Sequence, residues 1–306
     1  MSDLVKIEKL QQMLRTDPSN FQARRQLAMI LLDSGYTKEA LAHFLHLAEI
    51  FKDDSELFYN IGIIYEKLKD LKKAKDAYET AIQLAPDDVD AYYNLGLVYT
   101  DLGEQEKAID CFETVLDADN DDSNTYFNIG ICYFKQGKFD SAKYYFQRTI
   151  DLNDEDLYAH FYMGNIFVQE GQGDLAKEEF LKVLNVSPDY SWAYYNIAVL
   201  DFEQGDIISA INNLKLTLKY NPKDVEAYKV WAQILIKGKS YLEAVQVLNN
   251  ALSRCGEIGD LFYLRGEAYK RNGDIEKSKD SISLALKNFN TLSFDIEVVK
   301  DKLNSM

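Results

Sequence analysis

The sequence predicts an all-α solenoid built from eight helix-turn-helix repeats of 34 residues each. Three observations support this prediction. Shifting the chain by 34 residues aligns one position that is small in every copy: Ala40, Ala74, Ala108, Ala142, Ala176, Ala210, Ala244 and Ser278. Apolar residues recur at helical spacing within each copy, and glycine or proline stands between the helices. A fixed period of this length is the sequence signature of stacked helical repeats.

The eight repeats occupy residues 21–292 without an insertion or deletion, because 8 × 34 is 272 residues. The predicted units are 21–54, 55–88, 89–122, 123–156, 157–190, 191–224, 225–258 and 259–292. Positions within a unit are numbered from 1 to 34, so that Val89 is position 1 of the third repeat.

Residues 1–20 predict a leading amphipathic helix and a linker. Four apolar residues in this segment lie three or four residues apart: Leu4, Ile7, Leu10 and Leu14. This spacing places them on one face of a helix. We expect that face to dock on the first repeat.

Glycine marks the end of the first helix in most repeats, at position 15, where a left-handed backbone conformation terminates a helix. These residues are Gly35, Gly103, Gly137, Gly171, Gly205 and Gly273. A second glycine series stands mid-helix at position 8: Gly62, Gly96, Gly130, Gly164 and Gly266. Glycine there costs about 1 kcal/mol relative to alanine. We therefore expect the second helix to approach closely, with the small residue at position 20 facing the glycine.

Large residues at positions 11 and 24 predict the core between the two helices, as in Tyr99 and Phe112 of the third repeat. Asp201 departs from this pattern, because it stands at position 11 of the sixth repeat, where the other repeats are apolar. A lone buried carboxylate is costly. We therefore expect a hydrogen-bond donor or a lysine beside Asp201 and a structural adjustment there.

Charge narrows the range of partners. The chain has 306 residues, with 34 Lys and Arg against 50 Asp and Glu, and its net charge is −16. Such a surface repels nucleic-acid phosphates, so we expect no nucleic-acid partner. The third repeat is the acidic extreme, with ten acidic residues against Lys107. Its outer face is a candidate surface for a basic protein: Glu104, Glu106, Asp110, Glu113, Asp117 and Asp119.

Composition also indicates a compartment. No run of about 18 apolar residues is present that would span a bilayer, and the start MSDLVKIEKLQQ lacks the secretory pattern. The three cysteines are odd in number and lack metal-ligand spacing, which is typical of a reducing environment. We expect a cytoplasmic protein without direct membrane insertion.

One repeat unit carries a recognisable set of residues: Tyr92, Leu95, Gly96, Tyr99, Ala108 and Phe112. Proline stands at position 32 in four linkers. This pattern resembles the tetratricopeptide repeat (TPR) family over residues 21–292. The resemblance implies a right-handed α-solenoid whose first helices line a concave groove for peptides or protein segments. It also implies that residues 293–306 form a C-terminal capping helix.

On the first helices, positions 2, 5, 6, 9, 12 and 13 share one face, which the resemblance places in the groove. An aromatic row at position 5 runs beside asparagines at position 6. Asparagine amides can pair with an extended peptide backbone while the rings cover its apolar side chains. The row resembles the asparagine ladder of the O-linked N-acetylglucosamine transferases. The predicted peptide-binding residues are Tyr59, Asn60, Ile63, Tyr93, Asn94, Leu97, Phe127, Asn128, Ile131, Phe134, Tyr158, Phe161, Tyr162, Asn165, Trp192, Tyr195, Asn196, Val199 and Phe202.

Sharper functions lack support in the residues. The carboxylate clamp of heat-shock co-chaperones needs basic side chains where this chain has Glu226 and Val230. His43 and His46 have no third metal ligand nearby, and the glycine turn at 171–173 follows no strand, as a phosphate loop would. We expect no enzyme activity, no metal and no cofactor.

The sequence therefore predicts a non-catalytic scaffold or adaptor for protein–protein interaction. It would bind a peptide or an amphipathic helical segment in its concave groove, mainly at repeats four to six. Two alternatives stay open. One is a self-assembling scaffold, a homo-oligomer in which the leading helix docks on a neighbouring copy. The other is the substrate-recruiting subunit of a separate enzyme.

Overall fold

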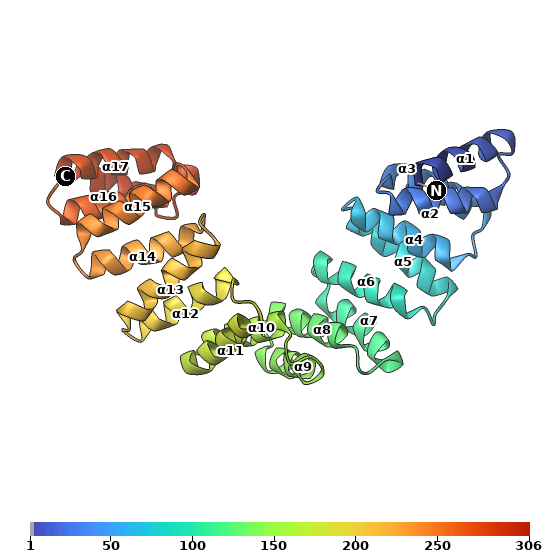
Figure 1. The fold of residues 1–306 in the computed structure, drawn as a ribbon, viewed down its shortest axis with the longest axis horizontal. Helices are drawn as coiled ribbons and strands as arrows, with labels where there is room; N and C mark the ends of the chain where they lie inside the picture. Colours follow the sequence, from blue (N-terminus) through green and yellow to red (C-terminus); the bar gives the residue numbers. More distant parts are fainter. Residues whose placement is uncertain (1–2) are drawn as a thin grey trace. The chain divides into compact units, whose positions relative to one another are not determined.

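The structure, a computed structural model, describes residues 3–306 and divides into two compact units. The first runs to Ala159 and the second starts at His160. Met1 and Ser2 of the predicted leading segment lie outside the described residues. Within each unit, consecutive helices pack as pairs (Figure 1). The chain is therefore an all-α repeat solenoid, as the periodicity predicts.

The first unit holds α1 (Asp3–Thr16), α2 (Phe21–Asp33), α3 (Thr37–Ile50), α4 (Ser55–Lys67), α5 (Leu71–Leu84), α6 (Val89–Leu102), α7 (Gln105–Ala118), α8 (Ser123–Lys135) and α9 (Phe139–Leu152). The division between the units lies within α10 (Leu157–Gln169). The second unit continues with α11 (Gly173–Val186), α12 (Ser191–Glu203), α13 (Ile207–Tyr220), α14 (Val225–Lys237), α15 (Tyr241–Cys255), α16 (Gly259–Arg271), α17 (Ile275–Lys287), the short 3₁₀ helix η1 (Phe289–Thr291) and α18 (Ile296–Asn304).

The turn inside a repeat requires a left-handed residue at position 15. Gly103 has φ 80° at this position and caps α6. Two repeats carry lysine there instead, and Lys69 and Lys239 still adopt φ values of 61° and 62°. A non-glycine residue is disfavoured by about 1–2 kcal/mol in this conformation. Packing of the helix pair therefore determines the turn even where the local residue opposes it.

In four repeats the nearest atoms to the mid-helix glycine belong to an aromatic ring at position 24 and not to the small residue at position 20 that we expected. In the eighth repeat, Gly266 lies against Ile282 and also contacts Ser278 at position 20. A Cβ added at Gly96 would lie 2.6 Å from the ring of Phe112, and one at Gly130 would lie 2.7 Å from Phe146. Both rings stand at position 24 and are buried. Positions 20 and 24 are one turn apart on the same helix face, and the longer side chain reaches the glycine. Glycine is retained because the ring occupies the space of its Cβ.

Both ends of the chain are covered by its own helices. Ile7 and Leu10 of α1 are buried in one cluster with Leu27 and Leu31 of α2. The leading helix therefore docks on the first repeat, as expected. At the other end, Val299 of α18 is buried in the cluster that contains residues of α16 and α17. These contacts cover apolar faces that a terminal repeat would otherwise expose.

Candidate peptide-binding site

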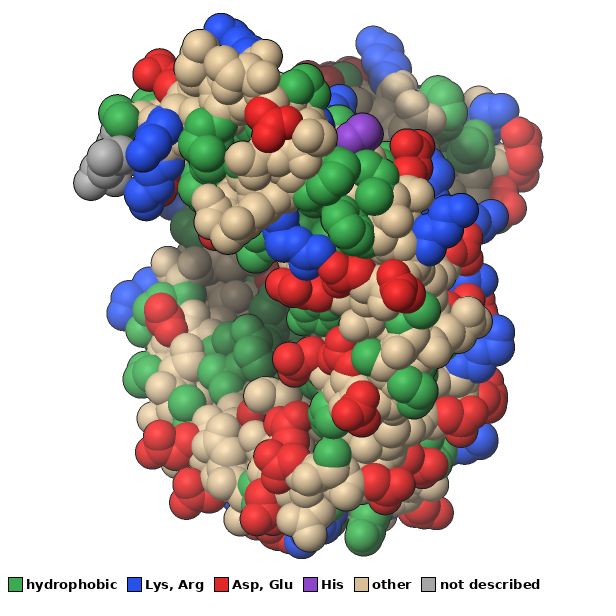
Figure 2. Space-filling view, turned by 90° about the vertical axis from the view of Figure 1, so that its right-hand side faces the viewer, with side chains coloured by type: hydrophobic (Ala, Val, Ile, Leu, Met, Phe, Trp, Pro, Cys, Tyr) green, Lys and Arg blue, Asp and Glu red, His purple; other side chains and the backbone are tan. Residues whose placement is uncertain are grey.

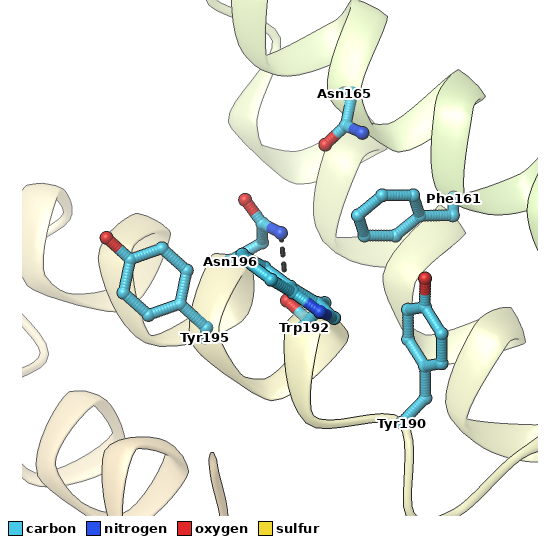
Figure 3. A pocket seen from close by; sticks show the side chains of 6 residues that line it. All are labelled: Phe161, Asn165, Tyr190, Trp192, Tyr195 and Asn196. Atoms are coloured by element: carbon cyan, nitrogen blue, oxygen red, sulfur yellow. Dashed lines mark hydrogen bonds between the residues drawn. The ribbon is translucent and has the colours of Figure 1, made fainter. Parts of the chain in front are cut away.

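A cavity of about 380 Å³ opens between α10 and α12 in the second unit. Its wall is formed by Phe161 and Asn165 of α10 and by Trp192, Tyr195 and Asn196 of α12 (Figure 3). Tyr190, in the loop just before α12, completes the wall. Five of these six residues belong to the predicted peptide-binding set. The structure thus brings together five of the residues predicted in the fifth and sixth repeats.

Ring packing holds the aromatic side of the cavity in place. Phe161 lies 5.8 Å from the buried Phe180 of α11 and 5.4 Å from Tyr190, measured between ring centroids. The second contact is edge to face, with an interplanar angle of 73°. Trp192 lies in the first turn of α12, which begins at Ser191, and is 52% exposed. A half-exposed tryptophan beside fixed rings is typical of a surface that binds a partner.

Tyr190 was absent from the predicted set, although the sequence held a signal for it. It stands at position 34, the N-cap of the following helix, where several other repeats have an aspartate: Asp54, Asp88, Asp122, Asp156 and Asp224. The Asp88 side chain, for example, accepts a hydrogen bond from the Ala91 backbone, whereas Tyr190 makes no such cap. Loss of an N-cap costs about 1 kcal/mol. Here a stabilising cap is replaced by a ring in the cavity wall.

Two position-6 asparagines of the first unit make hydrogen bonds between neighbouring repeats. Asn94 Nδ2 donates to the hydroxyl of Tyr59, and Asn128 Nδ2 donates to that of Tyr93, each at 3.1 Å. In each pair, the tyrosine at position 5 of one repeat meets the asparagine at position 6 of the next. Asn60 is buried and donates to the backbone oxygen of Glu56. The N–H groups of these three amides therefore already donate hydrogen bonds within the protein.

At the cavity the same pattern is broken. The partner expected for Asn196 is Phe161, which has no hydroxyl, and Asn196 Nδ2 turns to the Trp192 carbonyl at 2.8 Å. Among the described residues, the Asn165 amide, the Trp192 indole N–H and the Tyr195 hydroxyl make no hydrogen bond to the protein. These three groups are free to bind a ligand.

Local electrostatics keep the Tyr195 phenol protonated. Burial raises its pKa, and the nearby carboxylates of Glu226 and Asp224 raise it further, against an opposite effect of Lys229. The hydroxyl stays protonated at neutral pH, as a phenol ordinarily does, and can both donate and accept a hydrogen bond. Glu226 shares Lys229 with the buried Asp260, at distances of 3.0 and 2.8 Å. One cation between two carboxylates leaves the surroundings of Tyr195 acidic, although none of these charged residues lines the cavity.

The other predicted residues lie on the first helices but outside this cavity. The rings of Tyr59, Tyr93 and Phe127 pack on the position-24 rings of their own repeats at 5.6–5.9 Å. Tyr158 is 57% exposed and lies 6.4 Å from Phe127. The rest are half-buried side chains at positions 6, 9 and 12: Ile63, Leu97, Ile131, Phe134, Tyr162, Val199 and Phe202.

Asp201 has the partners that its burial predicts. Its two carboxylate oxygens accept hydrogen bonds from Lys177 Nζ at 2.5 Å and from Asn213 Nδ2 at 2.8 Å. The side chain is fully buried. The expectation of a lysine or hydrogen-bond donor beside it is confirmed.

His160 forms a second buried polar pair. Its Nδ1 lies 2.6 Å from Glu179 Oε2, and Lys182 Nζ lies 2.7 Å from the other oxygen of that carboxylate. Burial raises the pKa of Glu179, but the hydrogen bonds from His160 and Lys182 outweigh it, so the pKa is lowered. This arrangement fits a satisfied core histidine.

The acidic face of the third repeat is also solvent-accessible. Glu104 is half-buried. The other five carboxylates are exposed: Glu106, Asp110, Glu113, Asp117 and Asp119. Figure 2 views the structure from the side of the first unit and shows acidic side chains gathered over the lower part of that face. A basic partner there remains a prediction.

Within residues 3–306, no three His, Cys, Asp or Glu side chains are grouped to hold a metal ion. No helix in the described part of the chain is long and apolar enough to cross a membrane. Cys111, Cys132 and Cys255 are free thiols.

Comparison with known protein families finds matches to the tetratricopeptide repeat at residues 53–121, 123–156 and 259–289. Among curated proteins, anaphase-promoting complex subunit 3 of Schizosaccharomyces pombe is 39% identical over 71 residues. That match covers 23% of this chain and 11% of the relative. The chain therefore spans a small part of that protein's length.

Solved structures give matches over longer stretches. YrrB, described as a TPR protein with an unusual peptide-binding site, is 27% identical with a TM-score of 0.50, covering 60% of this chain and 95% of that one. The C-terminal part of a TPR protein from Cytophaga hutchinsonii is 18% identical with a TM-score of 0.64, covering 75% and 94%. A TPR protein from Parabacteroides merdae is 18% identical with a TM-score of 0.59, covering 82% and 97%. The last two likenesses concern the fold alone.

Proposed function

Since the chain belongs to the tetratricopeptide repeat family, we propose that it is a protein-interaction scaffold that captures a segment of a partner protein. The capture site is the cavity between α10 and α12. The solved structure of YrrB, whose description mentions a peptide-binding site, supports this assignment by similarity.

One observation carries the proposal. The cavity combines the half-exposed Trp192 with polar groups that the protein itself leaves unpaired, namely Asn165 and Tyr195. Exposed aromatic surface gains free energy when a partner covers it. Unpaired amide and hydroxyl groups gain hydrogen bonds at the same moment and fix the orientation of the segment. A packing surface of the repeat would need neither feature.

The chemistry of the cavity favours binding over catalysis. Its polar groups are two amides, two phenols and one indole N–H. These groups donate and accept hydrogen bonds, but they do not provide the nucleophile, base and orienting group that a reaction centre needs. We propose a non-catalytic role. Recruitment of a substrate to an enzyme on a separate chain would use the same cavity in the same way.

Self-assembly through the leading helix has less support. Ile7 and Leu10 are already buried against the chain's own first repeat. Docking on a second copy would first have to expose them, at about 25 cal/mol per Å² of apolar surface. We therefore place the partner at the cavity.

A pull-down from native extract tests the proposal. The bait is the full chain, as wild type and as the double variant Phe161→Ala, Trp192→Ala. Truncating two aromatic anchors should reduce partner recovery by about tenfold or more. The matched control is Ile208→Ala, which removes an apolar side chain that is 77% exposed on α13, outside the cavity. Undiminished recovery with the double variant, at unchanged thermal stability, would refute binding at this cavity.

A further inference from the structure

The free groups of the cavity are dominated by donors. The Trp192 indole N–H can only donate, whereas the Tyr195 hydroxyl and the Asn165 amide both donate and accept. Together the three groups hold four donor hydrogens and two acceptor oxygens. Asn165 adds an amide with no partner among the described residues. Figure 3 shows Asn165 beside Phe161 on α10 and Trp192 between these residues and Tyr195, whose hydroxyl points away from the rings of Phe161 and Tyr190. A complementary ligand therefore presents carbonyl oxygens without an equal number of N–H groups.

Three kinds of peptide conformation differ in this respect. An amphipathic helix satisfies its own carbonyls, so it would leave the cavity donors unpaired. An extended β-type strand presents as many N–H groups as carbonyls. A polyproline II helix has no internal hydrogen bonds, and proline has no N–H at all. Proline-rich segments therefore match the donor excess best.

The rings provide the second half of this complementarity. Phe161 and Tyr190 meet edge to face, and Trp192 stands half-exposed beside them. Aromatic-lined grooves are the general docking surface for polyproline II segments, whose conformation is largely formed before binding. Binding therefore loses little conformational entropy.

Charge beside the cavity specifies a neighbouring residue of the ligand. Glu226 lies close enough to Tyr195 to raise the pKa of its phenol. Its lysine partner, Lys229, is shared with Asp260. Asp189 stands next to Tyr190 and is exposed. These carboxylates are complementary to an arginine or lysine that flanks the prolines.

We propose that the cavity binds a proline-rich segment in the polyproline II conformation, with a proline against Phe161, Tyr190 and Trp192 and a basic residue facing Glu226. This inference rests on the proposed function, because it names the class of segment taken by the same cavity. It also accounts for Tyr190, where a helix-capping aspartate is exchanged for a ring that a proline can cover.

The test uses tryptophan fluorescence in the full chain. The chain has two tryptophans. Trp231→Phe leaves Trp192 as the only tryptophan, whose emission can be excited apart from that of the tyrosines, and it leaves the cavity wall intact because Trp231 is not part of it. The probe is a synthetic proline-rich peptide with one arginine at each end. We expect a saturable blue shift of Trp192 emission. The same peptide with alternate prolines changed to alanine should bind about tenfold more weakly.

Three cavity variants, measured by calorimetry with the same probe, test the individual contacts. Trp192→Phe keeps a ring but removes the N–H donor and should weaken binding about fivefold, as does loss of a single hydrogen bond. Asn165→Ala should have a similar effect. Glu226→Gln should weaken binding about threefold and flatten its salt dependence. Ile208→Ala on α13 is the control and should leave the Kd unchanged.

The outcomes separate the two proposals. If the alanine-substituted peptide or an amphipathic helical peptide binds as tightly as the proline-rich probe, the polyproline assignment is wrong, while loss of that binding in Phe161→Ala, Trp192→Ala would preserve the proposed function. If the probe binds but none of the three cavity variants changes its Kd, the site is elsewhere. If no peptide shifts Trp192 emission and the pull-down is also undiminished, both proposals fail.

Discussion

The two compact units differ in where they keep polar groups, although both are built on the same repeat. Up to Ala159, the buried polar side chains are neutral: Asn60, Thr125 and Thr149. From His160 onward, among the described residues, they include ionisable groups: His160, Glu179, Asp201, Asp224 and Asp260. The polar groups on the first helices also differ between the units. In the first unit, Asn94 and Asn128 bond to tyrosines, whereas in the second unit the Asn165 amide, the Trp192 indole N–H and the Tyr195 hydroxyl make no hydrogen bond to the described residues.

This difference shows which unit departs from pure packing. A neutral, saturated repeat is sufficient for a stable solenoid. Buried charges and unpaired groove groups are each unfavourable for stability unless something compensates them. In the second unit, hydrogen bonds and ion pairs within the protein compensate the buried charges, whereas the Asn165 amide, the Trp192 indole N–H and the Tyr195 hydroxyl make no hydrogen bond to the described residues. The second unit is therefore where binding and sensitivity to pH should concentrate.

The largest expected effect concerns the buried charge of Asp201. Lys177→Met removes its cation and should destabilise the protein by about 2 kcal/mol in urea denaturation. This is less than the 3–5 kcal/mol for a wholly buried pair, because Lys177 is 34% exposed. Adding Asp201→Leu should recover most of the loss. Lys75 occupies the same repeat position in the first unit, with only a loose 3.8 Å contact to Asp76. If Lys75→Met costs as much as Lys177→Met, the contrast between the units does not hold.

A second pair of variants examines what the units share. Gly130→Ala in the first unit and Gly164→Ala in the second would each place a Cβ 2.7 Å from a buried ring. Overpacking costs typically 1–3 kcal/mol, and the gain in helix propensity offsets about 1 kcal/mol of it. Both variants should therefore lose about 1 kcal/mol by thermal or chemical unfolding. Phe146→Leu should relieve the first, since Ala198 and Leu214 already occupy these two positions in the sixth repeat. Unequal costs would show that the aromatic framework also differs.

Lowering the pH should change the stability of the two units in opposite directions, with a smaller effect than the substitutions above. The pKa of Glu179 is lowered, so its contribution to stability is present above about pH 4.5 and is lost as the pH falls through the folded-state pKa. The pKa of Glu66 in the first unit is raised, chiefly by burial. Its protonation as the pH falls therefore favours the folded state. Hydrogen exchange followed between pH 6 and 3 should show weaker protection around α11 and none of this loss around α4. Glu179→Gln should abolish the effect in α11.

The smallest expected effect comes from exchanging one hydroxyl between the units. Phe161→Tyr restores the partner that Asn94 and Asn128 have, so Asn196 should donate to it and gain about 1 kcal/mol or less. Tyr93→Phe should cost a similar amount by freeing Asn128. The Asn196 side-chain amide signals in NMR report the first change directly. An unaltered amide environment in Phe161→Tyr would mean that the missing hydroxyl is not the reason that this asparagine bonds to the Trp192 carbonyl.

Much of this arrangement follows from the sequence, for physical reasons that differ by feature. Helix pairs follow from the 34-residue period, and a partner for Asp201 follows from the cost of an unpaired buried carboxylate. In four repeats the residue nearest the mid-helix glycine was not the one expected from the sequence, because positions 20 and 24 share one helix face and only packing decides which side chain reaches across. Tyr190 was missed because a cap residue is judged by its own helix, whereas here its ring serves a neighbouring one.

The hydrogen bonds between Tyr59 and Asn94 and between Tyr93 and Asn128 have a consequence for cooperativity. Each joins one repeat to the next, so it is a nearest-neighbour coupling in a quasi-one-dimensional chain. Where such a coupling is missing, opening of one repeat need not spread to the next. This coupling is missing between Phe161 and Asn196, because Phe161 has no hydroxyl and Asn196 bonds to the Trp192 carbonyl instead. The cavity therefore lies where one hydrogen bond between repeats is missing, so local unfolding of one repeat need not spread across it. The helices around the cavity can then adjust to a ligand while the neighbouring repeats stay folded.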